Sequence, residues 1–380
     1  MSITPAFFYN LLIEQGTDFF TGVPDSLLKS ICAYITDNSN NHIIAVNEGS
    51  AIALASGYHL ATGKIPLVYM QNSGIGNAVN PLLSLADGDV YRIPIILLIG
   101  WRGEPGTKDE PQHIKQGKVT CSLFDAMNIP YLIINPNNED EVKNQIYNCY
   151  SYVKKENTPF ALIIKKDTFA PYSLSSVTET GNETPEAVIS REEAIEEIIC
   201  SSEDNEVFIS TTGMASRELF ELRKKHNMGH EKDFLTVGSM GHSSSLALGI
   251  ALQKPNQPVT CIDGDGAALM HLGNFAAIGA QKPKNLRHFV LNNAAHDSVG
   301  GQPTIADKID LPGIAFAAGY DRIFFVKTKE ELQNVLKEKE RPLYIEILVR
   351  KGSRKDLGRP SSSPQENKKA FMQFLLRGES

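Results

Sequence analysis

Two buried-strand patterns in the C-terminal half, each ending in a polar turn, constrain the fold of this 380-residue chain most. Val259–Ile262 is rich in apolar and β-branched residues and breaks at Gly264, and Phe289–Leu291 ends in the same way before Asn292. An amphipathic helical stretch lies between them, so the pattern predicts a βαβ unit. Because a right-handed crossover makes the two strands parallel, the polar residues after both strands meet at one edge of the sheet.

The same alternation of apolar strands and helical stretches runs along most of the chain and predicts an α/β fold. Tyr172–Pro185 interrupts it, because Ser, Thr, Glu, Asn, Gly and Pro replace the periodic apolar residues there. We therefore expect two α/β domains with mainly parallel sheets, at residues 1–171 and 189–380, joined by a linker at 172–188. The expected strands are Pro66–Met70, Pro94–Ile99, Tyr131–Ile134, Ala161–Ile164, Val207–Ser210, Val259–Ile262, Phe289–Leu291 and Tyr344–Leu348.

Oxygen donors gather where the two C-terminal strands end. Gly264, Asp265 and Gly266 follow the first strand, and Asn292 and Asn293 follow the second after 25 intervening residues. Mg²⁺ prefers oxygen ligands and is often shared between one or two side chains and substrate phosphates, while glycines let a phosphate approach the backbone. Alternatively, the aspartate only caps the next helix and the asparagine only tolerates a left-handed turn.

Together, these two halves resemble the signature of thiamine-diphosphate (ThDP) enzymes. The resemblance implies that Asp265, Asn293 and the backbone carbonyl of Ala295 hold a divalent metal ion, which is Mg²⁺ or else Mn²⁺ or Ca²⁺. It also implies two ThDP-binding-type three-layer α/β domains, one for the pyrimidine ring and one for the diphosphate. The other residues implied to contact the diphosphate side are Thr212, Gly213, Gly264, Gly266 and Ala267.

Val237–His242 resembles the segment that bends the cofactor in these enzymes. By that resemblance, Met240 is a hydrophobic wedge between the two rings, and Gly238 offers its carbonyl to the cofactor's amino group. The alternative is that the methionine is an adaptable core filler.

The N-terminal half offers a candidate for the carboxyl that such enzymes place on the aminopyrimidine ring. Glu48 lies in the segment NEGSAIALASGYHLATGK, which resembles the pyrimidine-binding domain of ThDP decarboxylases. In that role its carboxyl helps the cofactor to lose its reactive proton. Alternatively, a first-turn glutamate is only stabilised by the helix dipole, by about 0.3–1 kcal/mol. The loop Asn72–Gly76 either lines a pocket or is simply packed tightly.

The chain length and two further segments indicate which family of ThDP enzymes the chain resembles most. Leu291–Thr304 and Lys351–Pro360 are similar to the phosphonopyruvate decarboxylase family, with sulfopyruvate decarboxylases a weaker match, and 380 residues leave no room for a middle domain. The implied reaction converts 3-phosphonopyruvate to phosphonoacetaldehyde and CO₂, within 2-aminoethylphosphonate-type biosynthesis. A sulfopyruvate decarboxylase and a non-catalytic ThDP-binding subunit are the alternatives. Arg354 and Arg359 are candidates for binding the phosphonate, unless their loop is only a solvated cationic face.

Decarboxylation also requires groups that move protons. Asp25, His113 and His296 are the candidates, because their expected loops lie near the motifs described above. In the structural alternative, Asp25 caps a helix and each histidine is an ordinary surface or hydrogen-bonded residue.

The composition and charge of the chain indicate which classes of binding partner to expect. A net charge of −7 argues against a general nucleic-acid or membrane-surface role, and the longest apolar run, Ile93–Ile99, is too short to span a membrane. The N-terminus lacks a signal-like segment and the five cysteines include no CxxC pair, so we expect a cytoplasmic protein with reduced thiols. The expected partner is a small anionic 2-keto acid. The resemblance further implies a homo-oligomer, at least a dimer, with active sites between subunits.

Overall fold

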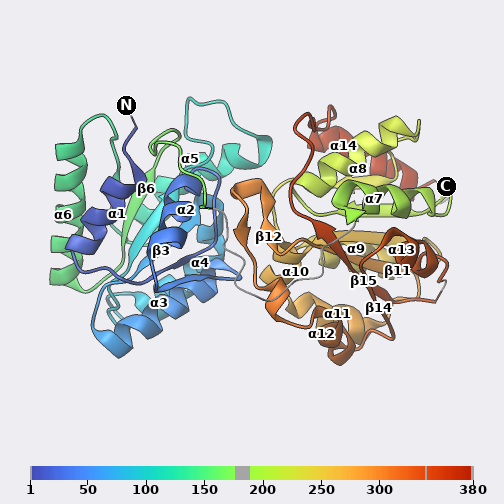
Figure 1. Cartoon of the computed structure of the whole chain (residues 1–380), viewed down its shortest axis with the longest axis horizontal. Coiled ribbons are helices and arrows are strands. Elements are labelled where there is room, and N and C mark those ends of the chain that lie inside the picture. Colours follow the sequence, from blue (N-terminus) through green and yellow to red (C-terminus); the bar gives the residue numbers. More distant parts are fainter. Residues whose placement is uncertain (1, 176–188, 339, 378–380) are drawn as a thin grey trace. The chain divides into compact units, whose positions relative to one another are not determined.

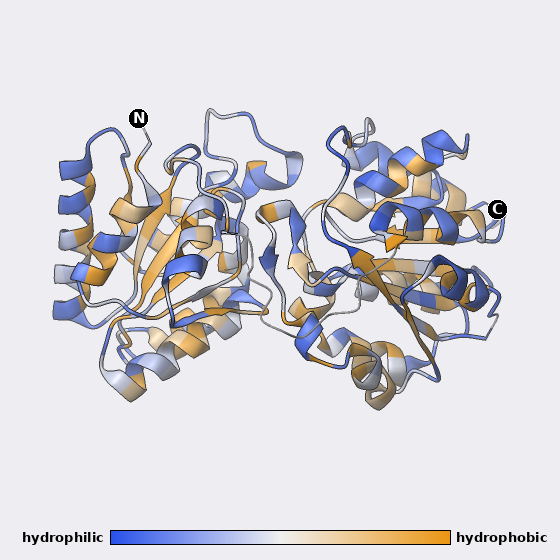
Figure 2. Cartoon of the chain, in the orientation of Figure 1, coloured by the Kyte–Doolittle hydropathy of each residue, from blue (hydrophilic) through white to orange (hydrophobic). Residues whose placement is uncertain are grey.

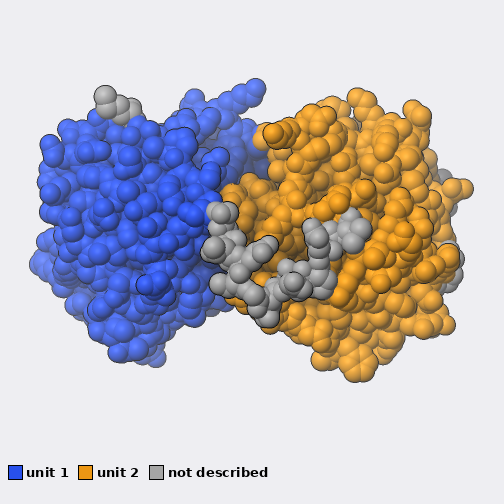
Figure 3. All heavy atoms as spheres, viewed as in Figure 1, with its two compact units in different colours: residues 1–180 blue, residues 181–380 orange. Residues whose placement is uncertain are grey.

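The computed structural model (Figure 1) describes residues 2–175, 189–338 and 340–377. The chain divides into two compact units, unit 1 at Met1–Thr180 and unit 2 at Gly181–Ser380 (Figure 3). This division falls inside the predicted linker 172–188, of which residues 176–188 lie outside the described residues. No helix in the described ranges is both long enough and apolar enough for a membrane span.

Unit 1 is built around a six-stranded sheet in which all strand pairs are parallel, in the order β2-β1-β3-β4-β6-β5. The strands are β1 (Phe20–Gly22), β2 (His42–Ile44), β3 (Leu67–Gln71), β4 (Ile96–Gly100), β5 (Tyr131–Ile133) and β6 (Phe160–Ile164). The helices are α1 (Pro5–Glu14), α2 (Lys29–Asn38), α3 (Glu48–Thr62), α4 (Ile75–Pro81), α5 (Pro111–Ala126) and α6 (Glu139–Glu156), with single helical turns at Asn72–Gly74 and Leu82–Ala86.

Alternating side chains give unit 1 an apolar core on each face of its sheet. Leu67 and Tyr69 of β3 pack with α1, α2 and α6, whereas Val68 and Met70 pack with α3, α4 and α5. The unit therefore has three layers. Figure 2 shows apolar strands between helices whose outer faces are polar. Burial on both faces explains why β3, β4 and β6 appear in the sequence as continuous apolar runs.

Unit 2 contains a parallel sheet in the order β14-β15-β11-β10-β8-β9, with β7 beside β15, and a separate antiparallel pair β12-β13. The strands are β7 (Ile189–Ser190), β8 (Val207–Ser210), β9 (Asp233–Leu235), β10 (Val259–Gly264), β11 (Leu286–Asn292), β12 (Ala295–His296), β13 (Gln302–Pro303), β14 (Arg322–Val326) and β15 (Leu343–Arg350). The helices are α7 (Arg191–Cys200), α8 (Met214–Lys225), α9 (Ser243–Gln253), α10 (Asp265–Met270), α11 (Gly273–Gln281), α12 (Leu311–Ala318), α13 (Lys329–Val335) and α14 (Pro364–Leu375), with single turns at Asp297–Val299 and Ala306–Lys308.

The two faces of the unit 2 sheet differ in polarity. One face is apolar and packs with α7, α8 and α13. On the other face, the paired residues Cys261, His288 and Tyr344 lie in one row across β10, β11 and β15, beneath Phe275 of α11. All eight predicted strands are present, and the predicted α/β fold with parallel sheets is confirmed.

Candidate active site

The two halves of the metal motif leave the unit 2 sheet at the same edge. β10 and β11 are parallel neighbours, with Gly264 opposite Leu291 in their register. Asp265 begins α10 directly after β10, and Asn293 follows β11 directly. Both residues therefore lie at the carboxyl edge, where parallel α/β sheets bind ligands.

Asp265 is a buried carboxylate with no ion-pair partner in the described part of the chain. The residue is 3% exposed, and Thr304 Oγ1 donates a hydrogen bond to its Oδ2. Burial raises the pKa of this carboxyl to about 6, although hydrogen bonds from Thr304 and from backbone N–H groups oppose that rise. A carboxylate that is costly to bury alone is stabilised when a cation binds it. This residue therefore fits a divalent metal ion.

Asn293 and Ala295 lie in a turn that is tied to Asp265. Thr304 N donates a hydrogen bond to Ala294 O over 3.1 Å, so the same threonine contacts both halves of the motif. Asn293 Oδ1 accepts a hydrogen bond from Ala295 N over 3.1 Å and keeps a second lone pair. Because Thr304 and Ala294 make the hydrogen bond between β12 and β13, the carbonyl of Ala295 points away from β13. Both oxygens are thus available to a metal ion.

The two adjacent asparagines have different neighbours. Asn292 Nδ2 donates a hydrogen bond to Glu346 Oε1 on β15 over 2.6 Å, and burial raises the pKa of Glu346 to about 7. Asn293 Nδ2 instead donates to Asp297 Oδ2 over 2.6 Å. Asn292 therefore joins the turn to the sheet, whereas Asn293 contacts residues of the turn itself.

Glycine residues bring the backbone close to other segments at this edge of the sheet. A Cβ on Gly266 would lie 2.9 Å from His296 Cε1 and 3.3 Å from Met240 Cε, so both side chains lie against this backbone. Gly238 N donates a hydrogen bond to Thr212 Oγ1 over 3.1 Å. This hydrogen bond joins the predicted diphosphate loop at 212–213 to the segment at 237–242.

The remaining residues predicted for the cofactor lie next to these segments. Gly213 precedes α8 with a φ of 97°, in the left-handed region that favours glycine. A Cβ on Gly213 would lie 4.0 Å from Ser298 Oγ, in the turn after β12. A Cβ on Gly241 would lie 2.9 Å from Ala267 O, so α10 packs against residues 237–242. The structure thus gathers the predicted cofactor residues of unit 2 around one sheet edge.

Arg354 carries a charge that is already balanced. Its Nε lies 3.0 Å from Glu192 Oε1, its Nη1 lies 3.1 Å from Asp356 Oδ2, and it forms a further ion pair with Glu221. Arg359 lies on the same loop, between β15 and α14. The phosphonate-binding role of both arginines stays a prediction, and the three carboxylates around Arg354 do not favour it.

Glu48 is a buried carboxyl at the first position of α3, after Asn47, whose side chain caps the helix. The residue is 5% exposed, and Asn77 Nδ2 donates a hydrogen bond to its Oε2 over 2.7 Å. Burial raises the pKa of Glu48, while the hydrogen bond from Asn77 opposes the rise. A side chain at Gly74 would collide with this carboxyl, so the loop Asn72–Gly76 lies directly against it.

Asp25 and His113 share a polar cluster with Arg102, a residue that the sequence analysis missed. Burial raises the pKa of Asp25 to about 6, and the charge of Arg102 partly opposes that rise. Arg102 Nη1 donates a hydrogen bond to Ser26 Oγ over 2.7 Å, and its Nε and Nη2 bind the two carboxylate oxygens of Asp109. The position of Arg102, just beyond the carboxyl end of β4, is the signal that would have identified it.

The cluster also contains buried polar atoms that have no hydrogen-bond partner in the part of the chain that the structure describes. Asp25 Oδ1 and His113 Nδ1 are buried and have no hydrogen-bond partner among the described residues. Burial, together with the charge of Arg102, lowers the pKa of His113 to about 4. Burial likewise lowers the pKa of His296 to about 4, against the opposing effect of Asp297. Both imidazoles are therefore neutral at pH 7.

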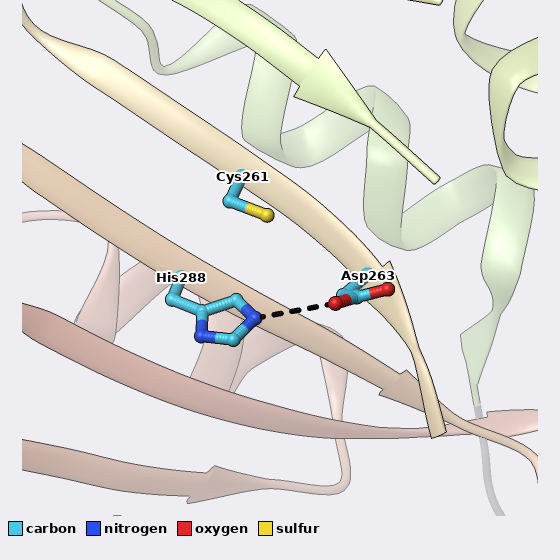
Figure 4. A group of neighbouring side chains, drawn as sticks. All are labelled: Cys261, Asp263 and His288. Atoms are coloured by element: carbon cyan, nitrogen blue, oxygen red, sulfur yellow. Dashed lines mark ion pairs between the residues drawn. The ribbon is translucent and has the colours of Figure 1, made fainter. Parts of the chain in front are cut away.

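A second group of polar side chains lies on one face of β10 and β11 (Figure 4). Cys261, Asp263 and His288 are fully buried there, and His288 Nε2 lies 3.7 Å from Asp263 Oδ2. His288 Nδ1 and the hydroxyl of Tyr320 share a hydrogen bond of 2.8 Å. Burial raises the pKa of the Cys261 thiol well above its ordinary value, so the thiol stays protonated and is a poor metal ligand. We interpret this group as part of the buried core.

Comparison with known proteins assigns the family. Residues 5–125 match the N-terminal TPP binding domain of thiamine pyrophosphate enzymes, and residues 210–347 match their C-terminal TPP binding domain. Thiamine pyrophosphate is another name for ThDP. The chain belongs to the thiamine pyrophosphate enzyme family.

Within this family, the chain is similar over nearly its whole length to named decarboxylases. It is 34% identical to the phosphonopyruvate decarboxylase of Streptomyces viridochromogenes, over 96% of this chain and 93% of that protein. The phosphonopyruvate decarboxylase of Streptomyces hygroscopicus is also 34% identical, over 96% of this chain and 92% of that protein. The sulfopyruvate decarboxylase of Methanosarcina acetivorans is 26% identical, over 96% of each chain. The resemblance to ThDP enzymes and to phosphonopyruvate decarboxylases, which was inferred from the sequence, is confirmed.

Proposed function

We propose that this protein is a ThDP- and Mg²⁺-dependent decarboxylase that converts 3-phosphonopyruvate to phosphonoacetaldehyde and CO₂, within a 2-aminoethylphosphonate-type biosynthesis. The observation that carries the proposal is the similarity to phosphonopyruvate decarboxylases over nearly the full chain, at 34% identity against 26% for the sulfopyruvate decarboxylase. The presence of both Glu48 and Asp265 supports catalysis over the role of a non-catalytic subunit.

In this proposal, Asp265, the side chain of Asn293 and the carbonyl of Ala295 would hold Mg²⁺, which would neutralise charge on the diphosphate. The backbone at 212–213 and 264–267 contacts the diphosphate, and Met240 lies against the rings. The bound cofactor supplies a thiazolium ring, which accepts the electron pair that is left when CO₂ departs.

Glu48 holds a proton at a ring nitrogen of the aminopyrimidine. Burial favours the protonated carboxyl, which is the form that donates a hydrogen bond to such a nitrogen. Asn77 keeps the carboxyl in one orientation by donating to Oε2. The absence of a side chain at Gly74 leaves the space that this carboxyl occupies.

Asp25 supplies the proton that replaces CO₂ at the carbonyl carbon of the substrate. Its pKa of about 6 suits exchange of a proton near neutral pH. His113 and His296, with pKa values of about 4, are neutral there and act as hydrogen-bond partners of the reacting groups.

Arg102 binds an anionic group of the substrate. Its five N–H donors exceed the three that Asp109 and Ser26 accept, and a guanidinium matches the geometry of carboxylate and phosphonate oxygens. It lies in the cluster of Asp25 and His113, whereas Arg354 is surrounded by carboxylates.

The active form in this proposal is a homo-oligomer, at least a dimer, with each site between the pyrimidine domain of one subunit and the diphosphate domain of another. The family resemblance supports this arrangement. Sedimentation of the cofactor-loaded protein measures it, and a monomer with full activity would contradict it.

The central test is CO₂ release by the purified protein with ThDP and Mg²⁺, on phosphonopyruvate, sulfopyruvate and pyruvate, with the aldehyde identified in each case. We expect the highest kcat/KM on phosphonopyruvate. A higher value on sulfopyruvate would keep the cofactor proposal and refute the substrate. No CO₂ from any substrate, with ThDP bound, would refute catalysis and favour the non-catalytic subunit.

A further inference from the structure

Asp297 joins the metal motif to two distant segments of unit 2. Its Oδ2 accepts hydrogen bonds from Asn293 Nδ2 over 2.6 Å, from Arg191 Nη1 over 3.0 Å and from Gly352 N over 3.0 Å. The side chain is 13% exposed, so water competes little for this oxygen. One carboxylate thus collects donors from the turn after β11, from α7 and from the loop after β15.

The contact with Asp297 selects which end of the Asn293 amide faces a metal ion. With Nδ2 held by Asp297, Oδ1 points to the other side, where it accepts a hydrogen bond from Ala295 N and keeps a lone pair. The flipped amide would place Oδ1 against the carboxylate and turn its N–H donors toward a cation. Both contacts would then be repulsive.

Arg191 holds Asp297 in its place. Its Nε and Nη2 donate hydrogen bonds to Glu218 over 2.7 and 2.9 Å, and it begins α7 as a residue that is 7% exposed. Arg191 Nη2 also donates to Gly352 O over 3.3 Å. Asp297 thus accepts a hydrogen bond from the N–H of Gly352, and Arg191 donates one to the C=O of Gly352. Together, Asp297 and Arg191 hold the start of the loop 351–363.

We infer that Asp297 is a positioning residue for the metal site, which orients the Asn293 amide and, with Arg191, ties the loop after β15 to this ligand. The inference rests on the proposed function, because it presumes a ThDP–metal complex at Asp265 and Asn293. In this role Asp297 acts through Asn293 and is not itself a metal ligand. Removing such an outer partner of a metal ligand typically lowers metal affinity about 10–100-fold.

The experiment titrates Mn²⁺ into the full-length protein with saturating ThDP, and measures free Mn²⁺ by its EPR signal. Asp297→Ala should raise the Kd about 10–100-fold, and Asp297→Asn should raise it less, because its amide oxygen still accepts a hydrogen bond from Asn293. With saturating metal, kcat of both variants should stay within about threefold of the wild-type value. The exposed Asp307, changed to asparagine, is the matched control and should leave the Kd unchanged.

A second background separates orientation from a purely structural role. Asn293→Asp gives a ligand whose two oxygens are equivalent, so that it has no wrong end to present. Asp297→Ala should therefore not weaken Mn²⁺ binding in the Asn293→Asp protein. Equal weakening in both backgrounds, or wild-type affinity of a folded Asp297→Ala protein, would overturn the inference. Failure of the wild-type protein to bind Mn²⁺ with ThDP would instead overturn the proposed function, and this inference with it.

Discussion

Replacing Asp25 by asparagine tests whether the polar cluster of unit 1 is maintained at the expense of stability. The carboxyl is 1% exposed, and burial raises its pKa from 3.8 to about 6. A shift of about 2 units corresponds to about 3 kcal/mol between the two protonation states. Asparagine fits the same space and still accepts the hydrogen bond that Leu27 N donates to Oδ2. The variant should therefore unfold with a free energy up to about 3 kcal/mol higher than the wild type at pH 8.

The sign of this effect follows from proton binding. Between pH 3.8 and about 6, the native state binds more protons at Asp25 than the unfolded state does, so wild-type stability falls as pH rises through this window. Below the window the carboxyl is protonated in both states, and the penalty vanishes. The gain from asparagine is thus fully present above pH 6 and is about half as large at pH 5.

Denaturant unfolding of the cofactor-free protein at pH 8 and pH 5 measures both values. Asp109→Asn is the matched control: burial raises the pKa of this carboxyl, but hydrogen bonds from Arg102 and Gly103 outweigh it and leave the pKa lowered, so its loss should destabilise. Turnover of Asp25→Asn should fall roughly 10²–10⁴-fold if it supplies the proton. Equal unfolding free energies of wild type and Asp25→Asn at pH 8 would refute the burial argument.

Four further predictions test the site. Glu48→Gln should lower kcat at least about 10²-fold with ThDP affinity retained, measured by calorimetry and CO₂ release, and normal turnover would exclude the proposed role. Gly74→Ala should lower kcat without changing metal affinity, because its methyl collides with the Glu48 carboxyl; unchanged kcat would show that this carboxyl can move freely. Asp265→Ala should weaken Mg²⁺-dependent ThDP retention in gel filtration, and retention equal to the wild type would contradict the metal assignment. Arg102→Gln should raise KM for phosphonopyruvate at least about tenfold while Arg354→Gln changes it little, and the reverse order would return the phosphonate to the C-terminal loop.

The strands that lie in apolar runs were predictable, whereas β1 and β2 were not. β10, β11 and β15 have six to eight residues and are buried along most of their length, so their apolar runs stand out in the sequence. The three residues of β1 include one apolar side chain and those of β2 include two, whereas the equally short β5 lies in the apolar run Tyr131–Ile134. The place of β1 and β2 in the sheet depends on pairing with each other and, for β1, with β3, and this pairing is a property of the folded chain.

The site could be predicted where its residues follow strands in the sequence. Asp265 and Asn293 obey the rule that polar residues after parallel strands meet at one edge. Thr304, Asp297 and Arg102 escaped the analysis for another reason. Their importance comes from hydrogen bonds made across the fold, and no local pattern reports such contacts.

The neighbouring asparagines at the end of β11 have a consequence for variation among relatives of this fold. Asn292 donates to Glu346 and Asn293 to Asp297, on different sides of the strand end. A one-residue slip of β11 would exchange the two side chains and remove the proposed metal ligand, because successive residues point to opposite faces. The connection His271–Leu272 between α10 and α11 packs against Gly241 and His242, so it too leaves little room for extra residues. Relatives that keep Asn293 in this role should therefore keep the number of residues from β10 to the end of β11.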